Sequence, residues 1–293
     1  MKKNTLSKDL DVDILGHLFW YSVGTVNITR SELQDLLYES KLSDEWLPRP
    51  ISKNDAFRRA TNEIQTSKRM SNQTKYFNYL VREVYNDKDY IQRNIIIENV
   101  NKKQSELNYN SRAAILYFNK NDGEFTYYNE SDIEEVEEVC QNAKYLFQIY
   151  STSYNEQHIR SMVLNILRTL SPIAMKKDGN IYFIPRHLED ELLGLTNFVN
   201  LLADNEAYQV PLIDTEDNQA MVLSKLNVRY DYLLSRANQD DKLRKDQLNL
   251  LIKDIRLLTD EFEKIEELLS VSNDELNRKN TRLKLEVFRL SKS

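Results

Sequence analysis

Three histidines and one cysteine are the side chains of this 293-residue sequence that most often bind metals or act as bases and nucleophiles. A metal site needs ligands that converge, commonly at positions i and i+3 or i+4 of one helix. His17, His158 and His187 have no histidine partner at such a spacing. The single cysteine, Cys140, excludes both a cysteine-based zinc cluster and an intramolecular disulfide bond. We therefore expect neither a metal nor a cofactor.

The nucleophile candidates also favour a structural interpretation. Cys140 follows Val136 by four residues and precedes Ala143 by three, which is the spacing of one buried helix face. The sequence has no Gly-x-Ser-x-Gly motif and no phosphate-binding Gly-x-x-x-x-Gly-Lys-Ser/Thr loop. The carboxylates of residues 134–138 have no histidine or basic neighbour and are typical of a solvated helix face. The sequence therefore predicts a protein that is not an enzyme.

A basic stretch gives the clearest polar pattern. Between residues 49 and 82 there are eight Lys and Arg and two acidic residues, and aromatic residues are interspersed among them. Such a patch can neutralise the phosphates of a nucleic acid. The alternative is that these cations form ion pairs with the acidic stretch 122–138, and the sequence does not decide between the two. The possible nucleic-acid-binding residues are Arg49, Lys53, Arg58, Arg59, Lys68 and Arg69.

Two α+β regions must position these side chains. The first, residues 14–130, begins with a short aromatic strand and two helices, and an antiparallel meander is expected to pack on these helices. The turn at 119–123 has its glycine where a positive φ is needed. The second, residues 131–217, is predicted to contain helices around a small hairpin at 174–184, an order similar to a winged helix-turn-helix. The helix at 158–170 is so apolar that a core role is favoured over DNA reading.

The segment from 218 to 293 contains no glycine or proline and carries the strongest pattern in the sequence. Thirteen positions from 248 to 290 alternate in steps of three and four, and ten are apolar, which predicts the seam of a coiled coil. The polar seam positions are Ser272, Lys279 and Glu286. Ser272 and Glu275 form a capping-box pattern, so the alternatives of one rod or a folded-back hairpin stay open. The expected oligomerisation residues are Leu248, Leu251, Ile255, Leu258, Phe262, Ile265, Leu269, Leu276, Leu283 and Leu290.

We therefore predict an α+β fold, with mixed helices and small antiparallel sheets in an N-terminal body. A long C-terminal coiled-coil-type helix or helical hairpin is expected to follow. The expected domains are a flexible tail at 1–13, the meander subdomain at 14–130, the winged-helix-like subdomain at 131–217 and the coiled coil at 218–293.

Three stretches resemble a family of phage- and plasmid-encoded proteins of unknown function. They are residues 16–24, which read GHLFWYSVG, residues 47–61, which read LPRPISKNDAFRRAT, and residues 179–186, which read GNIYFIPR. The resemblance extends over about residues 14–235 and leaves the C-terminal segment as the variable part. It implies a mobile-element setting, such as host takeover, defence or counter-defence, or replication support, and it assigns a role to no residue.

The predicted function is a non-catalytic, self-associating protein-binding scaffold or inhibitor that acts on a host defence complex. Its partners would be a second copy and another protein. The alternative is a nucleic-acid-binding accessory protein that dimerises through the C-terminal coiled coil. No apolar run approaches the roughly 20 residues of a membrane helix, and the N-terminus lacks an apolar signal sequence, so a cytoplasmic protein without membrane contact is expected.

Overall fold

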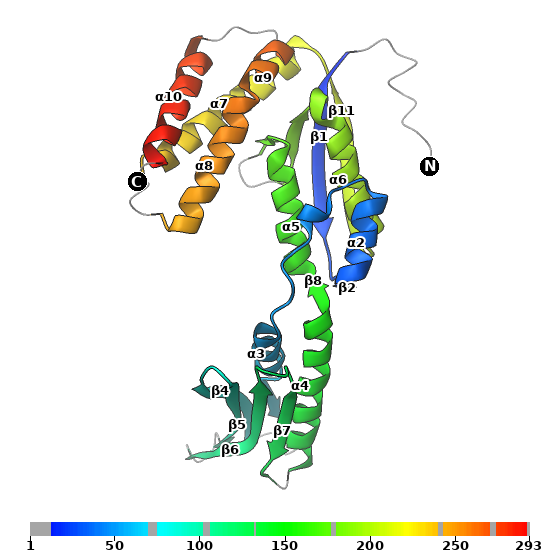
Figure 1. Ribbon diagram of the computed structural model, residues 1–293, viewed down its shortest axis with the longest axis vertical. Coiled ribbons are helices and arrows are strands. Elements are labelled where there is room, and N and C mark those ends of the chain that lie inside the picture. The colour runs from blue at the N-terminus through cyan, green and yellow to red at the C-terminus, as the bar shows by residue number, and fades with distance from the viewer. Residues whose placement is uncertain are drawn as a thin grey trace. The chain divides into compact units, whose positions relative to one another are not determined.

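The computed structural model describes residues 13–69, 75–101, 106–131, 133–176, 180–239, 243–269 and 274–291 (Figure 1). The chain forms two compact units. Unit 1 comprises Met1–Val26, Ser31–Leu47 and Asn155–Ser293, and unit 2 comprises Asn27–Arg30 and Pro48–Tyr154. The expected subdomain 14–130 is therefore divided between the units, because its first strand and the helix after it lie in unit 1. The paired strands β2 (Asn27–Thr29) and β8 (Ser153–Asn155) stand where the chain passes between the units.

Unit 2 is built on the expected antiparallel meander, with strand order β3-β4-β5-β6-β7. The helices that share its core are α3 (Lys53–Glu63) and α4 (Glu134–Thr152), whereas α2 (Arg30–Glu39) lies almost entirely in unit 1. The β6–β7 turn has Gly123 at φ 73°, and its amide donates to the Asn119 carbonyl at 2.9 Å, as the sequence predicts. The strands are β3 (Thr66–Arg69), β4 (Lys75–Asn86), β5 (Tyr90–Asn101), β6 (Glu106–Asn119) and β7 (Phe125–Asn129).

The core of unit 2 lies between α3, α4 and one face of this sheet. Phe57 of α3 stacks on Phe118 at 5.4 Å and meets the edge of Phe125 at 5.0 Å. Arg93 of β5 is also buried, and its guanidinium donates to the Arg58 carbonyl and the Thr61 hydroxyl of α3. A buried guanidinium needs hydrogen-bond acceptors, and α3 supplies them, so this contact fastens the helix to the sheet.

Unit 1 contains a four-stranded antiparallel sheet with the order β11-β1-β10-β9. The expected hairpin forms β9 and β10, but β10 pairs with β1, so the hairpin is part of a larger sheet and not a free wing. Helix α5 (Glu156–Thr169) buries its apolar side, in line with the core role favoured by the sequence. Helix α6 (Glu189–Leu201) packs against β11. The strands are β1 (Ile14–Val23), β9 (Ile173–Ala174), β10 (Tyr182–Pro185) and β11 (Asn205–Ile213).

The β11 edge of this sheet is closed to further strands. The Asn200 side chain accepts from the Ala207 amide at 2.7 Å and donates to the Ala207 carbonyl at 3.0 Å. Asn218 donates to the Ile213 carbonyl at 2.8 Å, and Pro211 has no amide hydrogen to offer. Edge strands are commonly protected by such devices, because free backbone groups invite pairing with another chain.

The expected long C-terminal coiled coil is wrong, because helices are distributed through the chain and the C-terminal segment folds as several shorter ones (Figure 1). Helices α8 (Lys245–Asp260) and α9 (Phe262–Leu268) run antiparallel to α7 (Glu216–Ala237) and α10 (Asp274–Leu290). Arg256 contacts Ser291 and Glu266 contacts Asn277, so α8 and α9 are antiparallel to α10. Helix α7 runs parallel to α10, because Asn227 contacts Lys279 and Ala237 contacts Arg289. An alternating three-and-four spacing marks one buried helix stripe, and an antiparallel bundle within one chain satisfies that spacing as well as an oligomer does.

The seam residues are buried inside this bundle. Nine of the ten are at most 7% exposed, and Leu248 is partly buried. Helix α7 provides the facing side with Val222, Leu226 and Tyr230, while Leu15 and Phe183 join the same core from the sheet. The polar seam position Lys279 pairs with Asp231 of α7 at 2.8 Å and with Glu275 at 3.0 Å. None of the helices in the described residues is long and apolar enough to cross a membrane.

Candidate functional site

Two of the predicted nucleic-acid-binding arginines, Arg58 and Arg59, already have partners. Arg58 forms ion pairs with Glu83 at 3.0 Å and Asp55 at 3.9 Å, and these partners lie outside the acidic stretch 122–138. The Arg59 guanidinium lies 3.7 Å from the centre of the Tyr150 ring. Both cations are thus used to hold α3 in unit 2.

The other four residues of that set are not brought together by the described contacts. Arg49 and Lys53 are exposed, before and at the start of α3. Lys68 and Arg69 lie on β3, and their side chains are outside the described part of the structure. Among the side chains that the structure describes, the basic stretch is therefore not gathered into one surface.

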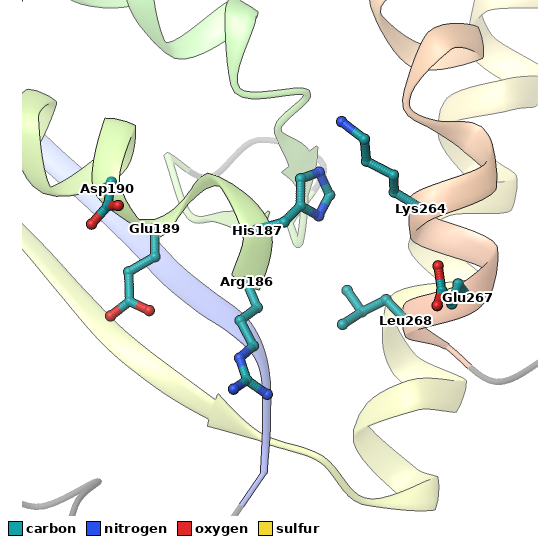
Figure 2. Close-up of a pocket in the computed structure, with 7 residues that line it drawn as sticks. All are labelled: Arg186, His187, Glu189, Asp190, Lys264, Glu267 and Leu268. Atoms are coloured by element: carbon teal, nitrogen blue, oxygen red, sulfur yellow. The ribbon is translucent and has the colours of Figure 1, made fainter.

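A charged cavity of about 580 Å³ lies in unit 1 between the start of α6 and helix α9 (Figure 2). The short helix η2 (Arg186–Leu188) and the first turn of α6 form one wall. Figure 2 shows His187 and Lys264 pointing toward one another across this cavity. Its lining residues are Arg186, His187, Glu189, Asp190, Lys264, Glu267 and Leu268.

The His187 imidazole and the Lys264 ammonium share one carboxylate. Glu261 lies 2.5 Å from His187 Nε2 and 3.1 Å from Lys264 Nζ. Burial acts to raise the pKa of Glu261, but the hydrogen bonds from His187 and Lys264 outweigh it, so the pKa lies below its ordinary value. The triad links η2 to the α8–α9 junction. We interpret it as a structural contact.

The remaining chemically active side chains also have structural surroundings. Burial lowers the pKa of His17, which lies 3.6 Å from Glu189. His158 forms a capping box with Asn155 at the start of α5. Cys140 is fully buried, and burial raises its pKa to about 12. Among the described residues no group of three or more His, Cys, Asp or Glu converges as a metal site.

A second cavity in unit 1, of about 900 Å³, runs along α8 and reaches the end of α10. We call it the α8 groove. Its apolar lining consists of Leu243, Leu248, Ile252, Leu257 and Leu290. Its charged lining consists of Lys245, Lys253, Arg256 and Asp260, which is three cations against one carboxylate.

Sequence reasoning identified two of the groove residues and missed the rest. Leu248 and Leu290 were expected in a self-association seam, and here they line the groove from α8 and α10. Ile252 and Leu257 lie off the seam. Their presence is a signal in the sequence, because a helix in a simple two-stranded coiled coil needs only one apolar stripe. Apolar residues outside that stripe indicate a second contact surface.

A family model described as "Family of unknown function (DUF6744)" matches residues 14–293 of the chain. The match begins at the first residue of β1 and includes the C-terminal helices, so it extends beyond residue 235, where the resemblance noted in the sequence was expected to end. No curated protein and no solved structure matches the chain.

Proposed function

We propose that this chain, which belongs to the DUF6744 family of unknown function, is a non-catalytic protein-binding scaffold that holds an acidic amphipathic segment of another protein in the α8 groove. One observation carries the proposal. The groove combines an aliphatic floor with a basic rim in a chain whose net charge is −6. An amphipathic helix lays its apolar face into such a groove, and its acidic residues then meet the rim.

The construction of the groove supports this use. The seam side of α8, with Leu251, Ile255 and Leu258, is buried in the bundle and fixes the helix in place. Lys253 and Arg256 are exposed, and Arg256 also lies 3.5 Å from Ser291 at the end of α10. A groove carried by packed helices offers a rigid surface, and a partner therefore binds without first having to order it.

Self-association remains part of the proposal only through another surface, because the seam residues are buried within the chain. Nucleic-acid binding through Arg58 and Arg59 has less support, since both guanidiniums have partners in unit 2. The resemblance to phage and plasmid proteins adds a setting to the proposal. In that setting the partner would belong to a host complex, for example a defence complex that the scaffold inhibits.

The test is a fluorescence-anisotropy titration of the full chain with a labelled helical peptide whose one face is leucine and whose other face is glutamate. We expect saturable binding, and we expect Lys253→Glu together with Arg256→Glu to weaken it at least tenfold, because the rim then repels the peptide. The matched control is Lys144→Glu with Arg282→Glu, which changes the same charge at exposed positions outside the groove.

A peptide with the same composition in scrambled order checks that amphipathicity matters. Ile252→Asp, which places a carboxylate in the apolar floor, should weaken binding as well. Equal affinity of the groove and control variants, or equal binding of the scrambled peptide, would remove the proposal.

A further inference from the structure

The sheet of unit 2 has a second face, opposite α3 and α4. Side chains alternate between the faces of a strand, and Tyr79, Val81, Ile95 and Leu116 belong to the core shared with the helices. Their strand neighbours point the other way. We call the surface formed by Arg82, Asn94, Ile96, Ile115, Tyr117 and Tyr128 the open face.

A row of four side chains crosses the open face from strand to strand. Arg82 of β4 is opposite Asn94 of β5, which is opposite Ile115 of β6, which is opposite Tyr128 of β7. The row therefore presents a cation, an amide, an aliphatic group and a phenol on adjacent strands. The Asn94 amide near the centre of the row suits a ligand that has both hydrogen-bonding groups and flat apolar surfaces.

The aromatic corner of the open face is exposed and supported from below. The Tyr117 and Tyr128 rings lie 6.0 Å apart at 81°, and Tyr128 is 59% exposed. Ile115 is only 3% exposed, yet it does not belong to the core shared with α3 and α4. The side chains of its own face therefore cover it, and the tyrosines stand on an apolar base while their rings remain accessible.

The open face also carries polar side chains on β4 and β5. Arg82 is exposed, and its guanidinium contacts the neighbouring Val81 carbonyl at 3.4 Å. Gln92, which lies opposite Tyr117, donates to Asn94 at 3.0 Å. Glu98 is the carboxylate on this side of β5, and it accepts from Asn78 at 3.3 Å.

We propose that the open face binds single-stranded nucleic acid. Bases stack on Tyr128 and Tyr117, and Arg82 contacts a phosphate. The side-chain amides of Asn94 and Gln92 meet the edges of the bases. A sheet covered by helices on one face, with aromatic and basic side chains on the other, is a surface on which unpaired bases stack. A duplex hides the faces of its bases and cannot use the tyrosines.

The experiment is anisotropy of labelled 15-nucleotide oligo-dT and oligo-U with the full chain, together with a 15-base-pair duplex. We expect both single strands, or one of them, to bind more tightly than the duplex, and the two arms distinguish DNA from RNA. Tyr128→Ala should weaken binding about 5- to 150-fold, the range for loss of one stacked base. Tyr128→Phe should restore it, because phenylalanine keeps the stacking surface.

Matched controls separate a local effect from a general one. Tyr145→Ala removes a tyrosine that is 60% exposed on α4, away from the open face, and should leave affinity unchanged. Arg82→Ala should reduce the slope of log affinity against log salt by about 0.7, the value for one phosphate contact on a single strand. Circular dichroism of each variant verifies folding.

Several results would overturn the inference. Absence of binding to either single strand, tighter binding of the duplex, or equal losses for Tyr128→Ala and Tyr145→Ala would each do so. If oligonucleotide binding is absent while Tyr128→Ala disrupts a complex with another protein, the open face is a protein interface. This proposal can fail or succeed separately from the α8 groove, because Lys253→Glu with Arg256→Glu should leave oligonucleotide affinity unchanged.

Discussion

At the scale of single residues, Glu261 shows how a charged side chain can resemble a catalytic group and act as a connector. Its carboxylate forms hydrogen bonds with His187 and Lys264 at the edge of a cavity. Carboxylates that act as general bases can have similar surroundings. However, its side chain is only 18% exposed, and its hydrogen bonds with both partners hold it in that setting. The carboxylate joins the α8–α9 junction to η2, and that role predicts a dependence of stability on pH.

The prediction follows from the direction of the pKa change. The pKa of Glu261 is lower in the folded chain than its ordinary value of 4.5. A depressed carboxylate contributes stability above its unfolded pKa, and this contribution is lost as the pH falls through the folded pKa. We expect Glu261→Gln to destabilise the chain at pH 7 and to have a smaller effect at pH 4, as measured by urea unfolding. A loss that is the same at both pH values would show that the charge of Glu261 has no part in it.

At the scale of elements, Arg229 connects α7 to the sheet and to α8. Its guanidinium donates to the Pro172 carbonyl, just before β9. Burial lowers the pKa of Arg229 to about 10, and the charge of Asp254 on α8 acts against this lowering. The Arg229 side chain therefore stays charged at neutral pH. Burial also raises the pKa of Asp254, and the charges of Arg168 and Arg229 oppose that rise.

Removing Arg229 should therefore loosen the packing of α7. We expect Arg229→Met to lower the free energy of unfolding by about 2–4 kcal/mol, because Asp254 loses a compensating charge in a partly buried setting. Arg282→Met, at an exposed position of α10, should change it by less than about 0.5 kcal/mol. Chemical denaturation of the unchanged chain and of the two variants measures these free energies. Similar unfolding midpoints for all three proteins would contradict this account of α7.

Local patterns in the sequence predict elements well and their partners poorly. The Gly123 turn follows from short-range chemistry, and it is present. The apolar spacing from 248 to 290 correctly identifies buried positions, but it does not say what buries them. Helix α7, which does so, has its own stripe at Val222, Leu226 and Tyr230. One buried stripe is compatible with an oligomer or with an internal bundle, so the choice depends on long-range packing.

Long-range pairing limits the prediction of the candidate sites for the same reason. Strand β1 pairs with β11, nearly two hundred residues later, and the Tyr128 row becomes visible only when the register of four strands is known. Similarly, Arg58 and Arg59 look available in the sequence because their partners, Glu83 and Tyr150, come from other elements. Charge and aromatic content therefore drew attention to a region of unit 2, but they did not indicate which of its faces remains accessible.

At the scale of the whole molecule, the chain carries two units with separate cores and a separate candidate surface on each. Unit 2 consists of Asn27–Arg30 and Pro48–Tyr154, and the chain returns to unit 1 at Ser31 and again at Asn155. The α8 groove belongs to unit 1 and the open face to unit 2. The two proposals can therefore be tested in one protein with independent substitutions, and a scaffold with two ligands of different chemistry is the function they jointly describe.

The central claim is that an acidic amphipathic segment binds in the α8 groove, and hydrogen exchange read by mass spectrometry tests it most directly. The full chain is measured alone and with saturating leucine–glutamate peptide. We predict slower exchange confined to peptides covering 243–260 and the end of α10 near 290, with Lys253→Glu and Arg256→Glu abolishing the change. Slower exchange elsewhere, with α8 unchanged, would contradict the account and place the partner site on another surface.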